Sequence, residues 1–201
     1  MPYRPGHKQE TRERIVKSAR RLFNRKGFAE VTIDEIMAGA GLTRGGFYKH
    51  FNAKEELYAD AILRFLCMDA PEPWQRKHVD ACAEGPTLAR MIVNAYLSRE
   101  HFEDRDGSCP LVALPSDVAR GGQAVKAAFR QVLNKMVGIF AANLTEPEAR
   151  QRALALVAIC VGGMVVARAI DEPALVGEFR EAARQSVPAI TGWGEGQAGA
   201  R

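Results

Sequence analysis

The sequence is poor in features that hold a protein in a membrane or cross-link it. It contains four cysteines among 201 residues and no Cys-x-x-Cys pair, so we expect reduced thiols and no disulfide framework. Its longest uncharged apolar run, residues 153–167, is about 15 residues long, shorter than the roughly 18 to 20 that span a bilayer. Residues 1–14 lack the apolar segment of a signal peptide. We therefore expect a cytoplasmic protein without a membrane partner.

Strand and metal patterns are equally scarce. No segment alternates apolar and polar residues as a half-buried strand does, and no Asn-Gly hairpin turn occurs. His78 and Cys82 are four residues apart and would share a helix face, but they supply at most half of a typical zinc ligand set. The expectation is an all-α protein that uses no metal and no other cofactor.

Charge is distributed unevenly along the chain. Residues 1–54 contain twelve Lys and Arg and five Asp and Glu, a net charge of +7. The remaining residues contain sixteen and nineteen, a net charge of −3. A basic N-terminal region on a mildly acidic body favours a polyanionic partner for that region. A solvated basic face would give the same count, so charge alone leaves both interpretations open.

Helix signals are strong in the basic region. Gly27 is a stop signal, and Thr32 with Glu35 forms a capping box that opens a short helix. Gly41 lies in the tight connection to the next helix. Two short helices joined by a Gly-containing turn are typical of a helix-turn-helix, which predicts DNA binding. The predicted helices cover residues 9–26, 32–39, 43–50 and a long segment from 52 onwards.

The segment TIDEIMAGAGLTRGGFYKHFNAKEELY, residues 32–58, resembles the signature of the TetR family of bacterial transcriptional regulators. The resemblance is detailed over residues 10–60 and extends further only as an all-helical body of fitting length. It implies that the third helix faces the base edges in the major groove. Gly45 and Gly46 then let the backbone approach DNA closely. Many family members carry a small hydroxyl residue where Gly46 stands, and its absence removes one base contact. The alternative is that the two glycines simply form a loop.

The resemblance also implies roles for single side chains. Arg44 is expected to contact guanine or phosphate, and Tyr48 to reach a phosphate through its hydroxyl group. Lys54 is expected to complete an anion site at a helix N-terminus. Phe47 and Phe51 are expected to form core beneath the third helix. The predicted DNA-contacting residues are Thr32, Thr43, Arg44, Gly45, Gly46, Tyr48, Lys49, His50 and Lys54, with Arg4 and Lys8 as a flexible arm.

Apolar helices are predicted in most of the remaining chain, over residues 87–99, 109–122 with a break at Pro115, 123–143, 146–170 and 174–190. The helix over 146–170 begins in a second capping box, residues 145–148, and is apolar nearly all round, so it must be buried on more than one side. The family resemblance implies that the last two helices of each chain form the interface of a homodimer. The candidate interface residues are Val157, Gly162, Gly163 and Val166, and the two glycines can equally pack against the chain's own core.

The family resemblance also implies an effector pocket among the middle helices, mostly apolar with a few polar groups. Candidate lining residues are Met91, Tyr96, Phe102, Cys109, Leu111, Leu114, Phe129, Leu133 and Met164, each of which can equally be core. The stretch DGSCPLVAL, residues 106–114, resembles a branch of the family that senses electrophiles or oxidants with a cysteine. Helix dipoles would favour the Cys109 thiolate. The alternative is a small buried apolar residue, which is our interpretation of Cys67 and Cys160.

These patterns predict an N-terminal three-helix helix-turn-helix head, residues 1–54, joined to an α-helical ligand-binding and dimerisation body, residues 55–192, with a flexible tail, residues 193–201. The predicted function is regulation of transcription, most simply repression at a palindromic operator in double-stranded DNA. Release would follow from a small-molecule effector or from modification of Cys109. The alternatives are an architectural DNA-binding protein without an effector, and a cysteine-dependent enzyme, although nothing in the sequence places His78 or His101 beside Cys109.

Overall fold

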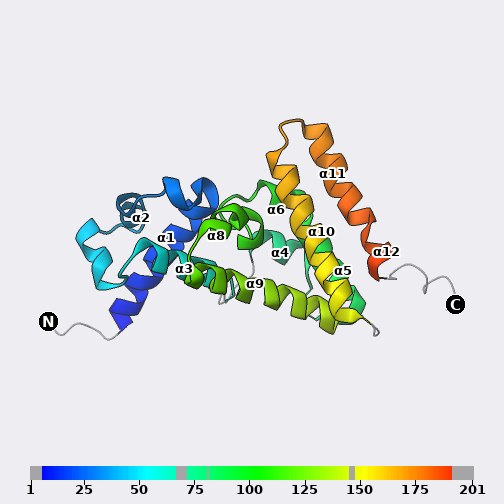
Figure 1. The fold of residues 1–201 in the computed structure, drawn as a ribbon, viewed down its shortest axis with the longest axis horizontal. Helices are drawn as coiled ribbons and strands as arrows, with labels where there is room; N and C mark the ends of the chain where they lie inside the picture. The colour runs from blue at the N-terminus through cyan, green and yellow to red at the C-terminus, as the bar shows by residue number, and fades with distance from the viewer. Residues whose placement is uncertain (1–5, 67–71, 81, 145–147, 192–201) are drawn as a thin grey trace. The chain divides into compact units, whose positions relative to one another are not determined.

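The computed structural model describes residues 6–66, 72–80, 82–144 and 148–191, and every regular element in these ranges is helical (Figure 1). The all-α prediction is confirmed. Some predictions fall outside the described residues, namely Arg4 of the predicted arm, the core position of Cys67, residues 145–147 of the second capping box and the tail at residues 193–201. Lys8, the other residue of the predicted arm, lies within the first helix instead. The helices are α1 (Gly6–Glu30), α2 (Ile33–Gly39), η1 (Arg44–Lys49), α3 (Lys54–Leu63), η2 (Arg64–Leu66), α4 (Pro73–His78), α5 (Gly85–Tyr96), α6 (Arg99–Glu103), α7 (Pro110–Ala113), α8 (Pro115–Arg120), α9 (Gln123–Ala142), α10 (Ala149–Ala169), α11 (Pro173–Gln185) and α12 (Val187–Thr191).

Predicted and observed helices agree best where local signals mark both ends. The break at Pro115 is confirmed, since α7 ends at Ala113 and α8 begins at the proline. The third predicted helix is the 3-10 helix η1, and the fourth is shorter than expected because α3 gives way to η2. Helices α4 and α6 were not predicted. Pro73 opens α4, because proline has the backbone angle that the first helical turn needs.

The chain divides into two compact units, each built from two stretches of sequence. Unit 1 contains Met1–Asp69 and Arg105–Val132, and unit 2 contains Ala70–Asp104 and Leu133–Arg201. Unit 1 therefore combines the predicted head with α7, α8 and the first part of α9. The functional division at residue 54 stays a prediction, because compactness does not show which segment binds which partner.

Unit 1 is organised around the apolar face of α1. Ile15, Ala19 and Phe23 have no exposed surface, and α2 and α3 pack against this helix. The ring of Tyr58 on α3 meets the Phe23 ring edge-on, with 4.8 Å between centroids. The helix is interrupted at Gly27, whose φ of 78° lies in the left-handed region that glycine adopts at no steric cost. The predicted stop at this glycine is confirmed.

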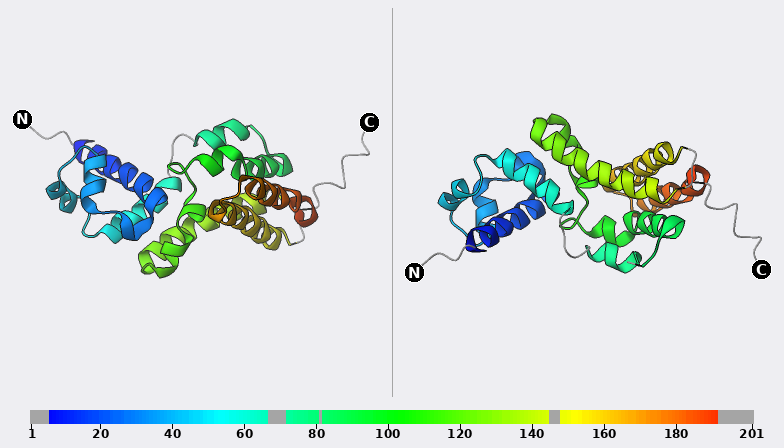
Figure 2. Two further views of the ribbon diagram at one scale, coloured as in Figure 1. Left: turned by 90° about the horizontal axis from the view of Figure 1, so that it is seen from above. Right: turned by 90° about the horizontal axis from the view of Figure 1, so that it is seen from below.

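Unit 2 contains α10 and α11 side by side, the gold and orange helices of Figure 2. A Cβ at Gly163 would lie 2.9 Å from the Cβ of Ala183 on α11, so this glycine allows a close approach inside its own chain. Val157 is also buried by its own chain. Gly162 has no neighbour within 4 Å of the Cβ direction, and Val166 is 41% exposed. Of the four candidate interface residues, only Gly162 and Val166 lie where a second subunit can reach them.

Helix α10 is long and apolar enough, by length and composition alone, to cross a membrane. The core helix of a soluble protein passes the same test. One side of α10 is buried and packs against α11 and α12. The other side is apolar and exposed, with Leu154 at 45%. We interpret α10 as a core helix with an uncovered outer face.

Candidate nucleic-acid interface

The predicted capping box opens α2. The Glu35 N–H donates to Thr32 Oγ1 over 3.1 Å, and the Thr32 N–H donates to Glu35 Oε2 over 2.9 Å. Lys26 donates to the other carboxylate oxygen over 2.7 Å. The hydrogen bond from Lys26 and those from Thr32 lower the pKa of Glu35 to about 2. The box therefore fixes the start of α2, whose end leads through Gly41, with φ 67°, to η1.

An aromatic base supports η1. Phe47 and Phe51 are 0% and 1% exposed, and their ring centroids lie 5.7 Å apart. The prediction that both phenylalanines are core is confirmed. Ile36 and Met37 of α2 are equally buried. Because large apolar side chains fill the space beneath η1, its backbone is held rigidly while its other side faces solvent.

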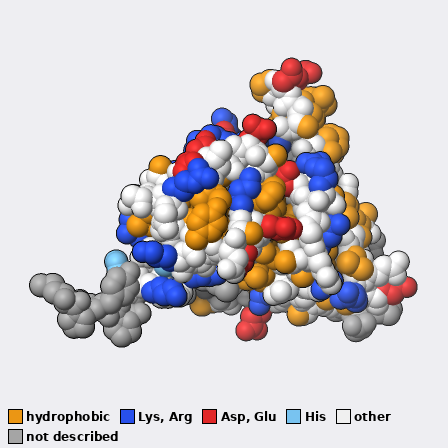
Figure 3. All heavy atoms as spheres, turned by 60° about the vertical axis from the view of Figure 1, so that its left-hand side comes forward, with side chains coloured by type: hydrophobic (Ala, Val, Ile, Leu, Met, Phe, Trp, Pro, Cys, Tyr) orange, Lys and Arg blue, Asp and Glu red, His pale blue; other side chains and the backbone are white. Residues whose placement is uncertain are grey.

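Three of the predicted DNA-contacting side chains, those of Arg44, Tyr48 and Lys49, lie on the solvent side of η1. Arg44 is 63% exposed and donates to Asp34 over 2.6 Å. Tyr48 is 61% exposed, and Lys49, Thr32 and Thr43 are exposed as well. Figure 3 shows Lys and Arg side chains at several places on the face that it draws. An exposed ion pair contributes little to stability, so Arg44 can exchange Asp34 for a nucleic-acid acceptor at small cost.

His50 is half-buried, in contrast to its exposed neighbours. Its Nδ1 has no hydrogen-bond partner among the described residues. Burial, followed by the positive charges of Lys8, Arg12 and Lys49, lowers the pKa of the imidazole. The ring is therefore neutral at physiological pH and adds no charge to the surface.

The two glycines of η1 differ in their surroundings. A Cβ at Gly45 would meet nothing within 4 Å, whereas one at Gly46 would lie 3.4 Å from the Met37 side chain. Neither glycine has a left-handed backbone. Nothing in the described protein therefore requires glycine at position 45, and its backbone is left bare at the start of η1.

Lys54 has a structural role that the sequence did not reveal. Its ammonium group donates to the carbonyl oxygens of Phe28 and Val31, each over 2.8 Å, and lies 4.2 Å from the centre of the Phe28 ring. Burial lowers its pKa, and the negative charge of Asp117 opposes that shift. Two of its three N–H groups thus fasten α3 to the end of α1, and the predicted anion contact stays a prediction. The acceptors lie 26 and 23 residues away in sequence, so no local pattern marks them.

The segment from α8 to α9 is fastened to the same turn. Asp117 Oδ2 accepts the Phe28 N–H over 2.8 Å, directly after the backbone reversal at Gly27. Glu55 Oε1 accepts the Gly122 N–H over 2.9 Å. The backbone of Phe28 is thus held at its N–H group by Asp117 and at its carbonyl oxygen by Lys54. This double attachment fixes the turn that leads into the capping box.

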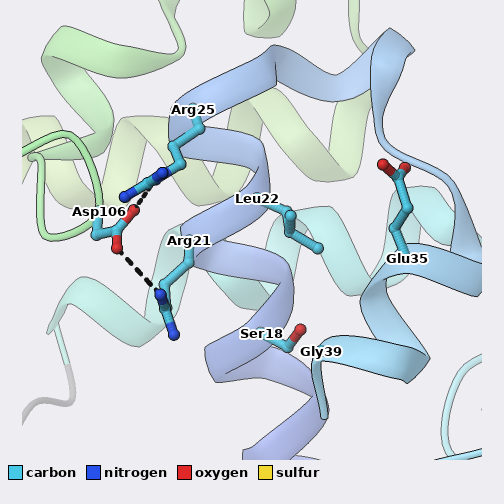
Figure 4. A pocket seen from close by; sticks show the side chains of 7 residues that line it. All are labelled: Ser18, Arg21, Leu22, Arg25, Glu35, Gly39 and Asp106. Carbon is cyan, nitrogen blue, oxygen red and sulfur yellow. Dashed lines mark hydrogen bonds and ion pairs between the residues drawn. The ribbon is translucent and has the colours of Figure 1, made fainter.

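A second attachment joins α1 to the loop before α7 (Figure 4). Arg21 and Arg25, one turn apart on α1, both donate to the carboxylate of Asp106. Asn24 donates to the carbonyl oxygens of Asp106 and Ser108, over 2.9 and 3.0 Å. Arg25 and Arg21 lower the pKa of Asp106 against the opposing effect of burial. A groove of about 200 Å³ lies beside these side chains.

The nine predicted effector residues are divided between the two units, and their common pocket stays a prediction. Cys109, Leu111, Leu114 and Phe129 belong to unit 1, and the other five to unit 2. Cys109 is 1% exposed and stands before the four-residue helix α7. Phe102 lines a groove on unit 2. No group of three or more His, Cys, Asp and Glu in the described ranges could hold a metal ion.

Comparison with known proteins assigns this helix-turn-helix. The model of the bacterial regulatory proteins of the tetR family matches residues 15–61, which contain α2, η1 and most of α3. The helix-turn-helix of this chain is therefore a TetR-family domain. The chain is 46% identical over 59 residues to the HTH-type transcriptional regulator YerO of Bacillus subtilis. It is 49% identical over 49 residues to TtgR of Pseudomonas putida. These matches cover 29% and 24% of this chain, and only 20% and 23% of the two TetR-family relatives.

Solved TetR-family structures extend the likeness to the whole fold. The reduced form of Escherichia coli NemR superposes with a TM-score of 0.71 at 20% identity, covering 90% of this chain and 96% of NemR. A TetR-family regulator from Agrobacterium tumefaciens gives a TM-score of 0.70 at 17% identity, covering 89% and 98%. Identities this low show a shared fold alone. Members of the TetR family are DNA-binding regulators and not enzymes.

Proposed function

We propose that this chain is a homodimeric repressor that binds a palindromic operator in double-stranded DNA and releases it in response to a small molecule. The observation that carries the proposal is the start of η1. Arg44 is held there by an exposed acid, the backbone of Gly45 is bare, and the helix rests on a buried aromatic base. A rigid helix that presents polar groups to solvent suits base and phosphate contacts in the major groove.

The outer faces of α10 and α11 support the dimer. The large apolar side chains exposed there are Leu154, Val166, Leu175 and Phe179, at 39% to 45%. Apolar side chains exposed together on two adjacent helices mark an interaction surface. Two heads joined in this way would present two copies of η1, which is what a palindromic site requires. The proposal places the protein in the cytoplasm, associated with the nucleoid.

Selection of bound sequences from random double-stranded DNA tests the proposal. Arg44→Ala should lose about 1–3 kcal/mol of operator binding and relax the preference at one base pair. Gly45→Ala should keep the unfolding temperature, because the Cβ meets no neighbour, yet weaken operator binding by obstructing close approach. Equal losses on operator and random DNA would contradict the role of Arg44. A selection that yields no sequence preference would indicate an architectural DNA-binding protein instead.

Release by modification of Cys109 is the second form of the proposed response. The thiol is 1% exposed, so a reagent reaches it only through local opening. An adduct would push on the loop that Asn24, Arg21 and Arg25 attach to α1. Cys109→Ser should therefore bind operator normally and ignore N-ethylmaleimide, whereas the wild type releases DNA. Equal release by the variant, with no adduct on Cys109 of the wild type by mass spectrometry, would leave a reversible ligand as the effector.

A further inference from the structure

A groove of about 500 Å³ opens on unit 2 beside α6, the connection between α10 and α11, and the first half of α11. Its volume is sufficient for a small organic ligand. Both apolar and charged side chains line it. The lining residues are Arg99, Phe102, Glu103, Ile170, Asp171, Pro173, Val176, Gly177 and Arg180.

One face of α11 forms a wall of the groove. Val176, Gly177 and Arg180 recur at helical spacing and all line it. A Cβ at Gly177 would meet nothing within 4 Å, so the groove reaches the backbone of α11 at this point. The exposed Leu175 and Phe179, four residues apart on the same helix, do not line the groove. A ligand in the groove would therefore press on the helix that also carries part of the proposed dimer surface.

The charges around the groove are unequally paired. Arg99 donates to Glu103 over 2.6 Å, whereas Arg180 has no carboxylate partner among the described residues. Its guanidinium donates twice to the Leu97 carbonyl oxygen, over 3.0 and 2.7 Å, and lies 5.5 Å from the centre of the Phe102 ring. Burial, followed by the positive charge of Arg184, lowers its pKa, and the negative charges of Glu100 and Glu103 act against that shift without a hydrogen bond to the guanidinium. Part of the guanidinium edge is left for another acceptor, because the group has five N–H donors.

We propose that this groove binds an organic acid, with its carboxylate on the open edge of Arg180 and its apolar body against Ile170, Val176 and Phe102. A guanidinium that lacks an anionic partner and is partly shielded from water forms strong hydrogen bonds with a carboxylate. Asp171 lines the same groove, and its carboxylate repels such a ligand. Neutralising Asp171 should therefore strengthen the binding of an acid and weaken the binding of an amine. The role of this groove as an effector site rests on the function proposed above. Its ability to bind an organic acid does not.

The charge of the ligand is tested by calorimetry on the full-length protein with three matched probes, phenylbutyrate, phenylbutylamine and phenylbutanol. The acid should bind at least about tenfold more tightly than the alcohol or the amine. Arg180→Gln should weaken binding of the acid about tenfold, and Asp171→Asn should strengthen it. Binding of the amine as tight as that of the acid, or an Arg180→Gln affinity equal to that of the wild type, overturns the proposal.

The location of the ligand is tested by filling the groove. Gly177→Leu places a side chain in the groove without a clash, since no atom lies within 4 Å of its Cβ. Gly138→Leu is the matched control, because Gly138 is also helical and has an equally open Cβ direction, but it is not in the groove. Gly177→Leu should abolish binding of the acid at an unchanged melting temperature, and Gly138→Leu should bind it as the wild type does. Retained binding by Gly177→Leu overturns the assignment.

The regulatory consequence is measured separately, by titrating the acid into the complex with selected operator DNA. The wild type should lose operator affinity, and Gly177→Leu should not. Release by both proteins alike overturns the effector role of the groove. Failure to select any operator overturns the proposed function, and the calorimetric result then still decides whether the acid binds at Arg180.

Discussion

Unit 1 and unit 2 expose opposite kinds of surface. Unit 1 presents Arg44, Tyr48 and Lys49 to solvent above buried Phe47 and Phe51. Unit 2 presents the apolar side chains of α10 and α11 to solvent over a core that contains the fully buried His101. A polar surface on an apolar base suits a hydrated polyanion, and an uncovered apolar face suits another protein surface. The contrast therefore separates the two kinds of partner that we propose.

The largest expected effect concerns the aromatic base of unit 1. Phe47→Ala removes a fully buried ring and should cost about 3–5 kcal/mol of unfolding free energy. Phe179→Ala is the matched control on unit 2, because its ring is 39% exposed. It should leave the stability of the monomer nearly unchanged and weaken the dimer. Denaturant unfolding and sedimentation of both variants measure this difference. Equal losses of stability would contradict the assignment of Phe47 to the core and of Phe179 to an exposed surface.

Lowering the pH should lower the folding stability through His101, which is buried in unit 2. This ring stacks on Trp74 with 3.9 Å between centroids, and its Nδ1 lies 2.7 Å from the Tyr96 carbonyl oxygen. Burial lowers its pKa from 6.5 to about 3. Between these values the unfolded chain binds a proton that the folded chain does not, so stability falls with falling pH, by up to about 1.4 kcal/mol per pH unit. Above the unfolded pKa, His101 contributes no pH dependence.

The check is denaturant unfolding of the wild type and His101→Phe at pH 7 and pH 5. The phenylalanine keeps an aromatic ring against Trp74 but cannot bind a proton. The variant should lose less stability than the wild type between the two pH values. An identical loss would show that other groups carry the acid sensitivity.

The two neighbouring glycines of α10 distinguish packing within the chain from packing between chains. Gly163→Leu forces a side chain towards Ala183 and should cost about 1–3 kcal/mol of stability. Gly162→Leu meets no neighbour in its own chain and should leave the monomer stable. If the outer face of α10 is the dimer surface, Gly162→Leu should change the monomer–dimer equilibrium in sedimentation. An unchanged equilibrium would place the dimer surface elsewhere.

The smallest effect concerns two lysines of the head. Lys54→Met keeps the apolar stem but loses both hydrogen bonds to the Phe28 and Val31 carbonyls, at a cost of about 1–2 kcal/mol of stability. Lys49→Met changes an exposed lysine, so stability should stay constant while the salt dependence of operator binding flattens. Thermal unfolding and binding at several salt concentrations separate them. A flattened slope for Lys54→Met at unchanged stability would support the predicted contact of Lys54 with the DNA backbone instead.

The head was predictable in detail because its signals are local. The side chain of Thr32 caps a helix that begins one residue later, and the Glu35 side chain, three residues away, accepts a hydrogen bond from the Thr32 backbone N–H. Gly27 and Gly41 stop helices by adopting positive φ values that other residues avoid. Phe47 and Phe51 share a face at helical spacing. Each of these features requires only a few neighbouring residues, so the amino-acid order determines them.

The roles of Lys54, Asp117 and Asp106 were decided only by tertiary structure. Their hydrogen-bond partners lie between 23 and 89 residues away in the sequence. The sequence around a single charged residue does not indicate which distant carbonyl, amide or guanidinium group it will contact. The same holds for Gly163, whose neighbour is set by the path of α11. By itself the sequence determined an all-helical chain with a basic helix-turn-helix, because caps, turns and periodicity act over a few residues. Packing decided which charges became attachments and which stayed available to a ligand, because burial and distance exist only once the chain is folded.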